Sequence, residues 1–145
     1  MAVKSALPDL GLGPNKIPDF TEKETQEKLS RSAMQAFFQI VEKWELTTAQ
    51  AIPLFGKISE SGFFELKKKQ DRALSQDELT RVSLVIGIFK ALNILFNEKL
   101  ANQWVTRPNK NPMFKEARPI DFMIKGGIPG MLSVRRFLDS ARGGR

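Results

Sequence analysis

The chain of 145 residues contains no cysteine, no histidine and no tyrosine. The missing cysteine excludes a disulfide framework, a thiol nucleophile and a cysteine-based metal site. The missing histidine removes the side chain that most often serves as general base or transition-metal ligand. No nucleophile, base and orienting group stand together in a recognisable pattern. The sequence therefore predicts a protein that is not an enzyme, with no catalytic residue, metal or cofactor.

Long apolar runs are also missing. The most apolar stretch, residues 82–96, is interrupted by Lys90 and Asn93 and is shorter than the roughly 20 residues that span a bilayer. The N-terminus lacks the basic and then apolar pattern of a secretory signal. Since 41% of the residues are hydrophobic, the chain can still build a core. We expect a cytoplasmic protein without membrane contact, folded as one domain or as a small domain with an arm.

The net charge of +7 lies entirely in the C-terminal half. Residues 1–71 carry ten basic and ten acidic side chains, whereas residues 72–145 carry 13 basic and six acidic ones. A basic surface attracts phosphates, acidic proteins or anionic pockets without distinguishing among them, and it also favours solubility.

The apolar periodicity predicts an all-α fold with no strand. Residues 1–20 are rich in proline and glycine and predict a flexible arm. Apolar residues at helical spacing predict helices over residues 21–44, 48–55, 59–69, 76–96 and 98–105, and short helices after Pro119 and Pro129, with a break at Gly126-Gly127.

Helix starts are indicated by polar side chains three residues apart. Thr47 with Gln50, and Ser75 with Glu78, have the capping-box pattern. The helix after Ser75 is predicted to be the longest and the central buried one. Its several apolar faces exceed what a small domain easily buries, so we expect a homodimer.

Residues 48–69 have the outline of a helix-turn-helix, with a turn at Gly56. Several features disagree with that motif: Pro53 in the first helix, Gly62 where an apolar residue usually packs, Phe63-Phe64 suited to a core, and the neutral charge of this half. A plain three-helix packing unit is the alternative. In a DNA-binding unit, the base-reading candidates are Ser59, Glu60 and Ser61, and the phosphate-binding candidates are Lys57, Lys67 and Lys68.

The C-terminal third contains a tryptophan, a turn and a basic amphipathic helix. Trp104 precedes the Arg107-Pro108-Asn109 turn, whereas Trp44 stands at an apolar helical position that predicts core packing. Met131, Val134, Phe137 and Leu138 share one apolar face beside Arg135 and Arg136. The chain then ends in a basic segment, residues 141–145, which we call the C-terminal tip. Arginine suits bidentate contacts with carboxylate or phosphate, and a frayed terminus is the alternative.

The order and spacing of several residues resemble the toxin-binding domain shared by the Xre, MbcA and ParS antitoxins. The resemblance covers about residues 31–143. It rests on Leu46…Ala51…Leu54-Phe55-Gly56, Leu74-Ser75…Glu78…Arg81, Trp104…Pro108-Asn109, Pro119…Gly126 and Val134…Leu138-Asp139.

This resemblance implies a member of a type II toxin–antitoxin pair. After the arm at 1–20, it implies a helix-turn-helix-like domain at 21–71 that represses its own operon, and a toxin-binding domain at 72–145. The cognate toxin would be of the RES type, which consumes NAD or transfers ADP-ribose. The C-terminal tip would block its NAD pocket, and the homodimer would sit within a larger complex. The implied toxin-binding residues are Trp104, Asn109, Met131, Arg135, Arg136, Phe137, Leu138, Arg142 and Arg145, with Arg135 and Arg136 at the pocket rim. A DNA-binding transcriptional regulator without a toxin partner is the alternative.

Overall fold

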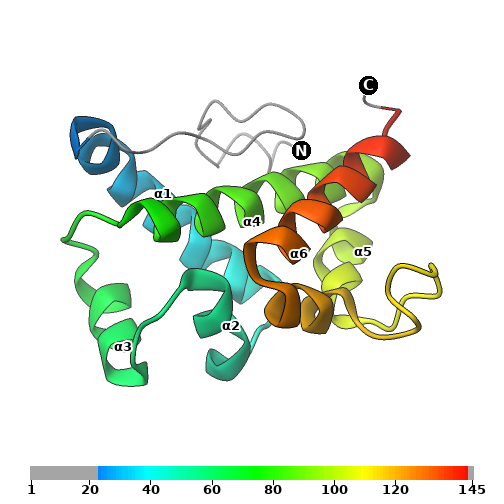
Figure 1. The fold of residues 1–145 in the computed structure, drawn as a ribbon, viewed down its shortest axis with the longest axis horizontal. Helices are drawn as coiled ribbons and strands as arrows, with labels where there is room; N and C mark the ends of the chain where they lie inside the picture. Colours follow the sequence, from blue (N-terminus) through cyan, green and yellow to red (C-terminus); the bar gives the residue numbers. More distant parts are fainter. Residues whose placement is uncertain (1–22, 144–145) are drawn as a thin grey trace.

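A computed structural model describes residues 23–143, with side chains from Leu29 onward. The predicted arm at 1–20 and the tip residues Gly144 and Arg145 lie outside the described residues. Over the described range the fold is all-α, as the periodicity predicts (Figure 1). The elements are α1 (Lys23–Lys43), α2 (Thr48–Phe55), α3 (Glu60–Lys69), α4 (Gln76–Leu95), α5 (Glu98–Gln103), the 3-10 helix η2 (Trp104–Thr106) and α6 (Pro119–Ala141).

Both predicted capping boxes are present. The hydroxyl of Thr47 accepts from the backbone N–H of Gln50 at 3.1 Å, and the Gln50 side chain accepts from the N–H of Thr47 at 2.9 Å. Ser75 and Glu78 repeat the arrangement at 3.1 and 2.9 Å at the start of α4. These bonds satisfy N–H groups that have no partner inside the helix, so local sequence fixes where α2 and α4 begin.

Helix α4 is the central element, with α1 and α6 packed against it and α2 and α5 also in contact (Figure 1). Its side chains are buried without interruption from Glu78 to Thr80 and from Val82 to Phe89. At 20 residues it is nevertheless shorter than α1 with 21 and α6 with 23, so the prediction that it is the longest helix was wrong. Because its apolar side chains from Leu79 to Leu92 are buried within the chain, that stretch supplies no reason for a homodimer. Among residues 23–143, no helix is long and apolar enough to cross a membrane.

Helix α6 contains the predicted glycine break. Gly127 has φ 63° and ψ −148°, a conformation that favours glycine, and the helix kinks there. Pro129 follows in the first turn after the kink, where its missing N–H costs no hydrogen bond. The two predicted short helices are therefore the two segments of α6.

Aromatic side chains tie the first three helices together. Phe37 of α1 lies 5.5 Å from Phe55 of α2, and Phe38 lies 5.3 Å from Phe63 of α3, measured between ring centroids. Phe63 is buried as predicted, but its neighbour Phe64 is 48% exposed, so the expectation that both belong to the core was half wrong. Trp44 is buried, as predicted, 6.3 Å from Phe89 of α4. One core therefore runs through both predicted domains.

Candidate functional site

An aromatic cluster holds the C-terminal third together. Phe114 is its buried centre, with ring centroids 5.8 Å from Trp104, 5.9 Å from Phe137 and 5.3 Å from Phe122. Trp104 also stacks on Phe137 with the centroids 6.4 Å apart and the planes at 22°. Trp104 and Phe137 are only partly buried. The structure thus brings these two predicted toxin-binding residues together at a surface.

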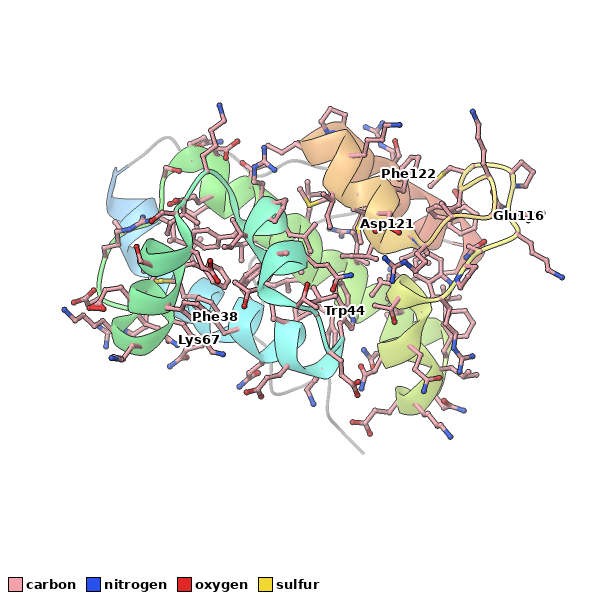
Figure 2. The ribbon with its side chains drawn as sticks, turned by 90° about the horizontal axis from the view of Figure 1, so that it is seen from below. Phe38, Trp44, Lys67, Glu116, Asp121 and Phe122 are labelled. Atoms are coloured by element: carbon pink, nitrogen blue, oxygen red, sulfur yellow. The ribbon has the colours of Figure 1, made fainter. Side chains whose placement is uncertain are left out.

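The loop between η2 and α6, residues 107–118, is ordered by its own asparagines. The side chain of Asn109 accepts from the N–H of Asn111 at 2.9 Å, and the side chain of Asn111 accepts from the N–H of Met113 at 3.0 Å. The side-chain oxygen of Asn109 is therefore bonded within the loop, whereas the family resemblance implied that Asn109 contacts the toxin. Figure 2 shows Glu116 on this loop, which stands out from the helices.

Arg135 occupies a buried site rather than the surface. Its guanidinium lies against Gly87 of α4, where a Cβ atom would come within 2.6 Å of Arg135 Cζ. It forms an ion pair with Asp139 at 3.4 Å, and Asp139 also accepts from Arg142 at 3.0 Å. The exposed fractions of the Arg135 and Asp139 side chains are 7% and 3%. The prediction of Arg135 as a rim residue therefore needs correction: it holds α6 to α4 and, through Asp139, orients Arg142.

Two further predicted toxin-binding side chains face the interior. Met131 and Leu138 are fully buried, together with Val134, because the apolar face of α6 packs on α4. The face was identified correctly, but its partner is the chain itself. Arg136 and Arg142 are exposed, and Arg145 lies outside the described residues. The sequence predicts no role for Gly87, and for Asp139 it offers only a place in the family pattern. The one local signal for the Arg135–Asp139 ion pair is their spacing of four residues.

The predicted DNA-binding side chains gather on and before α3. Lys57, Ser59, Glu60, Ser61, Lys67 and Lys68 are all exposed. Ser59, however, caps α3, because its hydroxyl accepts from the N–H of Gly62 at 3.0 Å. Lys67 lies beside Phe38 at the edge of a groove that Phe64 also lines (Figure 2). This face combines cationic, acidic and apolar side chains.

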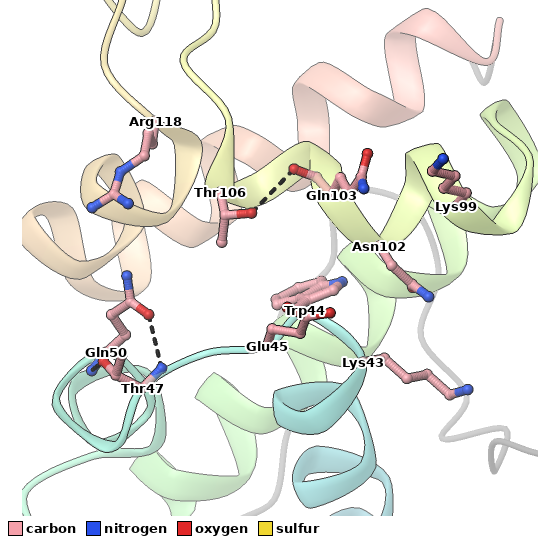
Figure 3. A pocket seen from close by; sticks show the side chains of 10 residues that line it. All are labelled: Lys43, Trp44, Glu45, Thr47, Gln50, Lys99, Asn102, Gln103, Thr106 and Arg118. Atoms are coloured by element: carbon pink, nitrogen blue, oxygen red, sulfur yellow. Dashed lines mark hydrogen bonds between the residues drawn. The ribbon is translucent and has the colours of Figure 1, made fainter.

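A polar groove of about 460 Å³ separates the end of α1 and the start of α2 from α5 and η2 (Figure 3). Its lining includes the cationic side chains Lys43, Lys99 and Arg118 and the carboxylate of Glu45. Arg118 is already paired with Asp121 at 2.8 Å. Among the described residues, no group of three acidic side chains that could hold a metal ion is present.

The start of α4 carries a perturbed carboxylate. Arg72 donates two hydrogen bonds to Glu78, at 2.9 and 3.0 Å. Burial raises the pKa of Glu78, but the hydrogen bonds from Arg72 and Ser75 outweigh burial, so the pKa lies below its ordinary value. The pair closes the loop between α3 and α4 and has a structural role.

Comparison with known proteins identifies the C-terminal part. Residues 91–144 match the family described as "Antitoxin Xre/MbcA/ParS C-terminal toxin-binding domain". The chain is also 38% identical over 112 residues to the "Uncharacterized protein y4oB" of Sinorhizobium fredii (strain NBRC 101917 / NGR234), an alignment covering 77% of this chain and 84% of that protein. The matched residues contain α5, η2, the ordered loop and α6, which form the aromatic cluster and the buried ion pairs. Residues 91–144 are therefore a C-terminal toxin-binding domain of the Xre/MbcA/ParS antitoxin family.

Proposed function

We propose that this antitoxin neutralises a RES-type toxin, which consumes NAD or transfers ADP-ribose, by inserting its C-terminal tip into the toxin's NAD pocket. The observation that carries the proposal is the end of α6, where Ala141, Arg142 and Gly143 are exposed beyond the last buried residue, Asp139. A segment without a large apolar side chain contributes little to its own core and is free to serve a partner.

The chemistry of the tip suits a pocket built for a dinucleotide. Gly143 has φ 76°, and the absence of a side chain lets the backbone approach a narrow wall closely. A guanidinium presents planar, bidentate donors, and these can pair with groups of the toxin that would otherwise bind the dinucleotide. Arg142 is held by Asp139, which would orient it before the toxin binds. Inhibition would then compete with NAD.

Two truncations test the blocking step. Removing residues 143–145 leaves the Arg142–Asp139 ion pair intact, whereas removing residues 141–145 also removes that pair. Both truncated antitoxins should remain folded and bound to the toxin, while NAD consumption by the purified complex rises relative to the full chain. A truncated complex that stays assembled and fully silent would mean that inhibition comes from distortion of the toxin or from coverage by α6.

Toxin binding itself is tested by co-expression and gel filtration at micromolar concentration. The antitoxin and the toxin are expected to elute together. Separate elution would favour the alternative, a DNA-binding regulator without a toxin partner. The same complex allows light scattering to test a homodimer, which would join two DNA-binding units and raise avidity without new contacts.

Autorepression is the remaining part of the proposal. The exposed lysines Lys57, Lys67 and Lys68 support phosphate contacts at α3. Changing all three to alanine should weaken operator binding and flatten its dependence on salt concentration. An unchanged slope would assign the phosphate contacts to another surface, such as the basic C-terminal half.

A further inference from the structure

Large exposed apolar side chains concentrate at one corner of the molecule. Among the described residues, the most exposed large hydrophobic side chains are Phe64, Ile94, Phe96 and Leu100, with exposed fractions of 48%, 52%, 36% and 44%. Three of the four lie within seven residues of one another, where α4 ends and α5 begins. Neighbouring apolar side chains left in solvent are typical of a protein-binding surface, whereas a single one is ordinary.

The chain conformation keeps this corner rigid. Phe96 ends α4 with an N–H that donates to the carbonyl of Leu92 at 2.9 Å. The next residue, Asn97, caps α5, since its side chain accepts from the N–H of Leu100 at 2.9 Å. Both flanking helices are therefore held by bonds on either side of the corner. A surface that is ordered before binding loses less conformational entropy on association.

The corner is continuous with the residues already predicted to touch the toxin. Leu100 and Trp104 are four residues apart along α5 and η2, and Trp104 has helical backbone angles, so both side chains lie on one face. Trp104 in turn stacks on Phe137 of α6. Apolar surface thus extends from Leu100 through Trp104 to α6.

The corner also lies beside the base of the C-terminal tip. Arg135 of α6 lies against Gly87 of α4. Seven residues make two helical turns, so a residue seven positions further along a helix lies on the same face. Ile94 is therefore on the face of α4 that carries Gly87, and Arg142 is on the face of α6 that carries Arg135. Figure 1 shows the C-terminal ends of α4 and α6 at the same end of the molecule, next to α5.

We propose that Ile94, Phe96 and Leu100 form the main docking surface for the toxin, which we call the α4–α5 corner. The inference rests on the toxin-binding role of residues 91–144, within which all three side chains fall. The toxin should offer a complementary apolar surface edged by polar groups, because the side chains of Glu98 and Lys99, both exposed, lie beside the corner. Docking at the corner would bring the C-terminal tip to the toxin's pocket. The corner would then supply the affinity for the toxin, and the neighbouring tip would block its pocket.

The test replaces exposed apolar groups with a helix-compatible polar one. The Ile94→Gln and Leu100→Gln substitutions should leave the fold intact, since both side chains are exposed and glutamine is a good helix former. The matched control is Phe64→Gln, which removes a comparably exposed side chain from α3. The probe is the toxin encoded by the neighbouring reading frame, purified in a catalytically inactive form, with the dissociation constant measured by calorimetry and the melting temperature of each variant recorded.

Each corner substitution should weaken toxin binding about tenfold and the double variant about a hundredfold, whereas Phe64→Gln should leave the affinity unchanged. If the wild-type chain binds the toxin and the double variant binds it with the same affinity, the corner is not the docking surface, although the chain still binds a toxin. Failure of the wild-type chain to bind would instead refute the toxin partnership. If the double variant retains the affinity but loses self-association in light scattering, the corner joins two copies and the proposal is wrong. Equal weakening by Phe64→Gln would also overturn it.

Discussion

The substitution Gly87→Ala should destabilise the protein, although alanine favours helix more than glycine does. Gly87 lies inside α4, where the intrinsic preference for alanine is worth about 1 kcal/mol. The added methyl group would come within 2.6 Å of Arg135 Cζ and 3.0 Å of Arg135 Nε. The buried guanidinium must then move, which weakens its ion pair with Asp139.

The magnitude follows from setting these opposing effects against each other. Overpacking a well-filled core costs about 1–3 kcal/mol, and the helix preference offsets about 1 kcal/mol of that cost. The difference is a fall in the free energy of unfolding of up to about 2 kcal/mol, which lowers the melting temperature by up to roughly 8 °C for a chain of this size. Calorimetry and urea unfolding measure both quantities.

Two variants isolate the cause. In an Arg135→Met background the clash is relieved, so adding Gly87→Ala should raise the free energy of unfolding by about 1 kcal/mol, a reversal of sign. Gly126→Ala is the matched control, because a Cβ atom at Gly126 would meet nothing within 4 Å. An identical effect of Gly87→Ala in both backgrounds, or a gain in stability in the wild-type background, would refute the packing of Arg135 against α4.

Three further outcomes follow from the site and its supports. Phe114→Ala removes the centre of the aromatic cluster and should lower the free energy of unfolding by about 3–5 kcal/mol, with faster trypsin cleavage in the loop 107–118; an unchanged cleavage rate would show that the loop is ordered by its asparagines alone. Ser75→Ala removes a capping bond and should cost about 1 kcal/mol in urea unfolding, and no cost would mean that the start of α4 is held by tertiary packing. Because the pKa of Glu78 is lowered in the folded state, its stabilising contribution is present at neutral pH and lost as the pH falls through that lowered value. The stability difference between the wild type and Glu78→Gln should therefore shrink below about pH 4, whereas a difference constant with pH would contradict the role of the Arg72 pair.

The local features of the helices could be predicted because the interactions that set them are local. A capping box joins residues three apart, so the starts of α2 and α4 follow from Thr47, Gln50, Ser75 and Glu78 alone. The kink at Gly127 is equally local, because glycine accepts a positive φ and Pro129 suits the turn that follows. The all-α class and the antitoxin family were accessible from the same kind of pattern.

Burial could not be predicted in the same way, since it depends on which helices meet. Periodicity correctly grouped Met131, Val134 and Leu138 on one face, but it could not tell a face that packs on α4 from one that waits for a toxin. The family resemblance implied a place for Arg135 at the rim of the toxin's pocket; a glycine far away in sequence makes the space that buries its guanidinium. For the same reason the sequence could not predict that Phe63 is buried while its neighbour Phe64 is exposed.

The sequence by itself determined the all-α class, the helix starts at Thr47 and Ser75, the break in α6 and the family, because each rests on short-range bonds or on residue order. Only the tertiary structure decided which predicted toxin-binding side chains remain at the surface. Packing of α6 on α4 buried three of them, while the corner at Ile94 and Leu100 was left exposed. The physical reason is that exposure belongs to the assembled helices and not to any one segment.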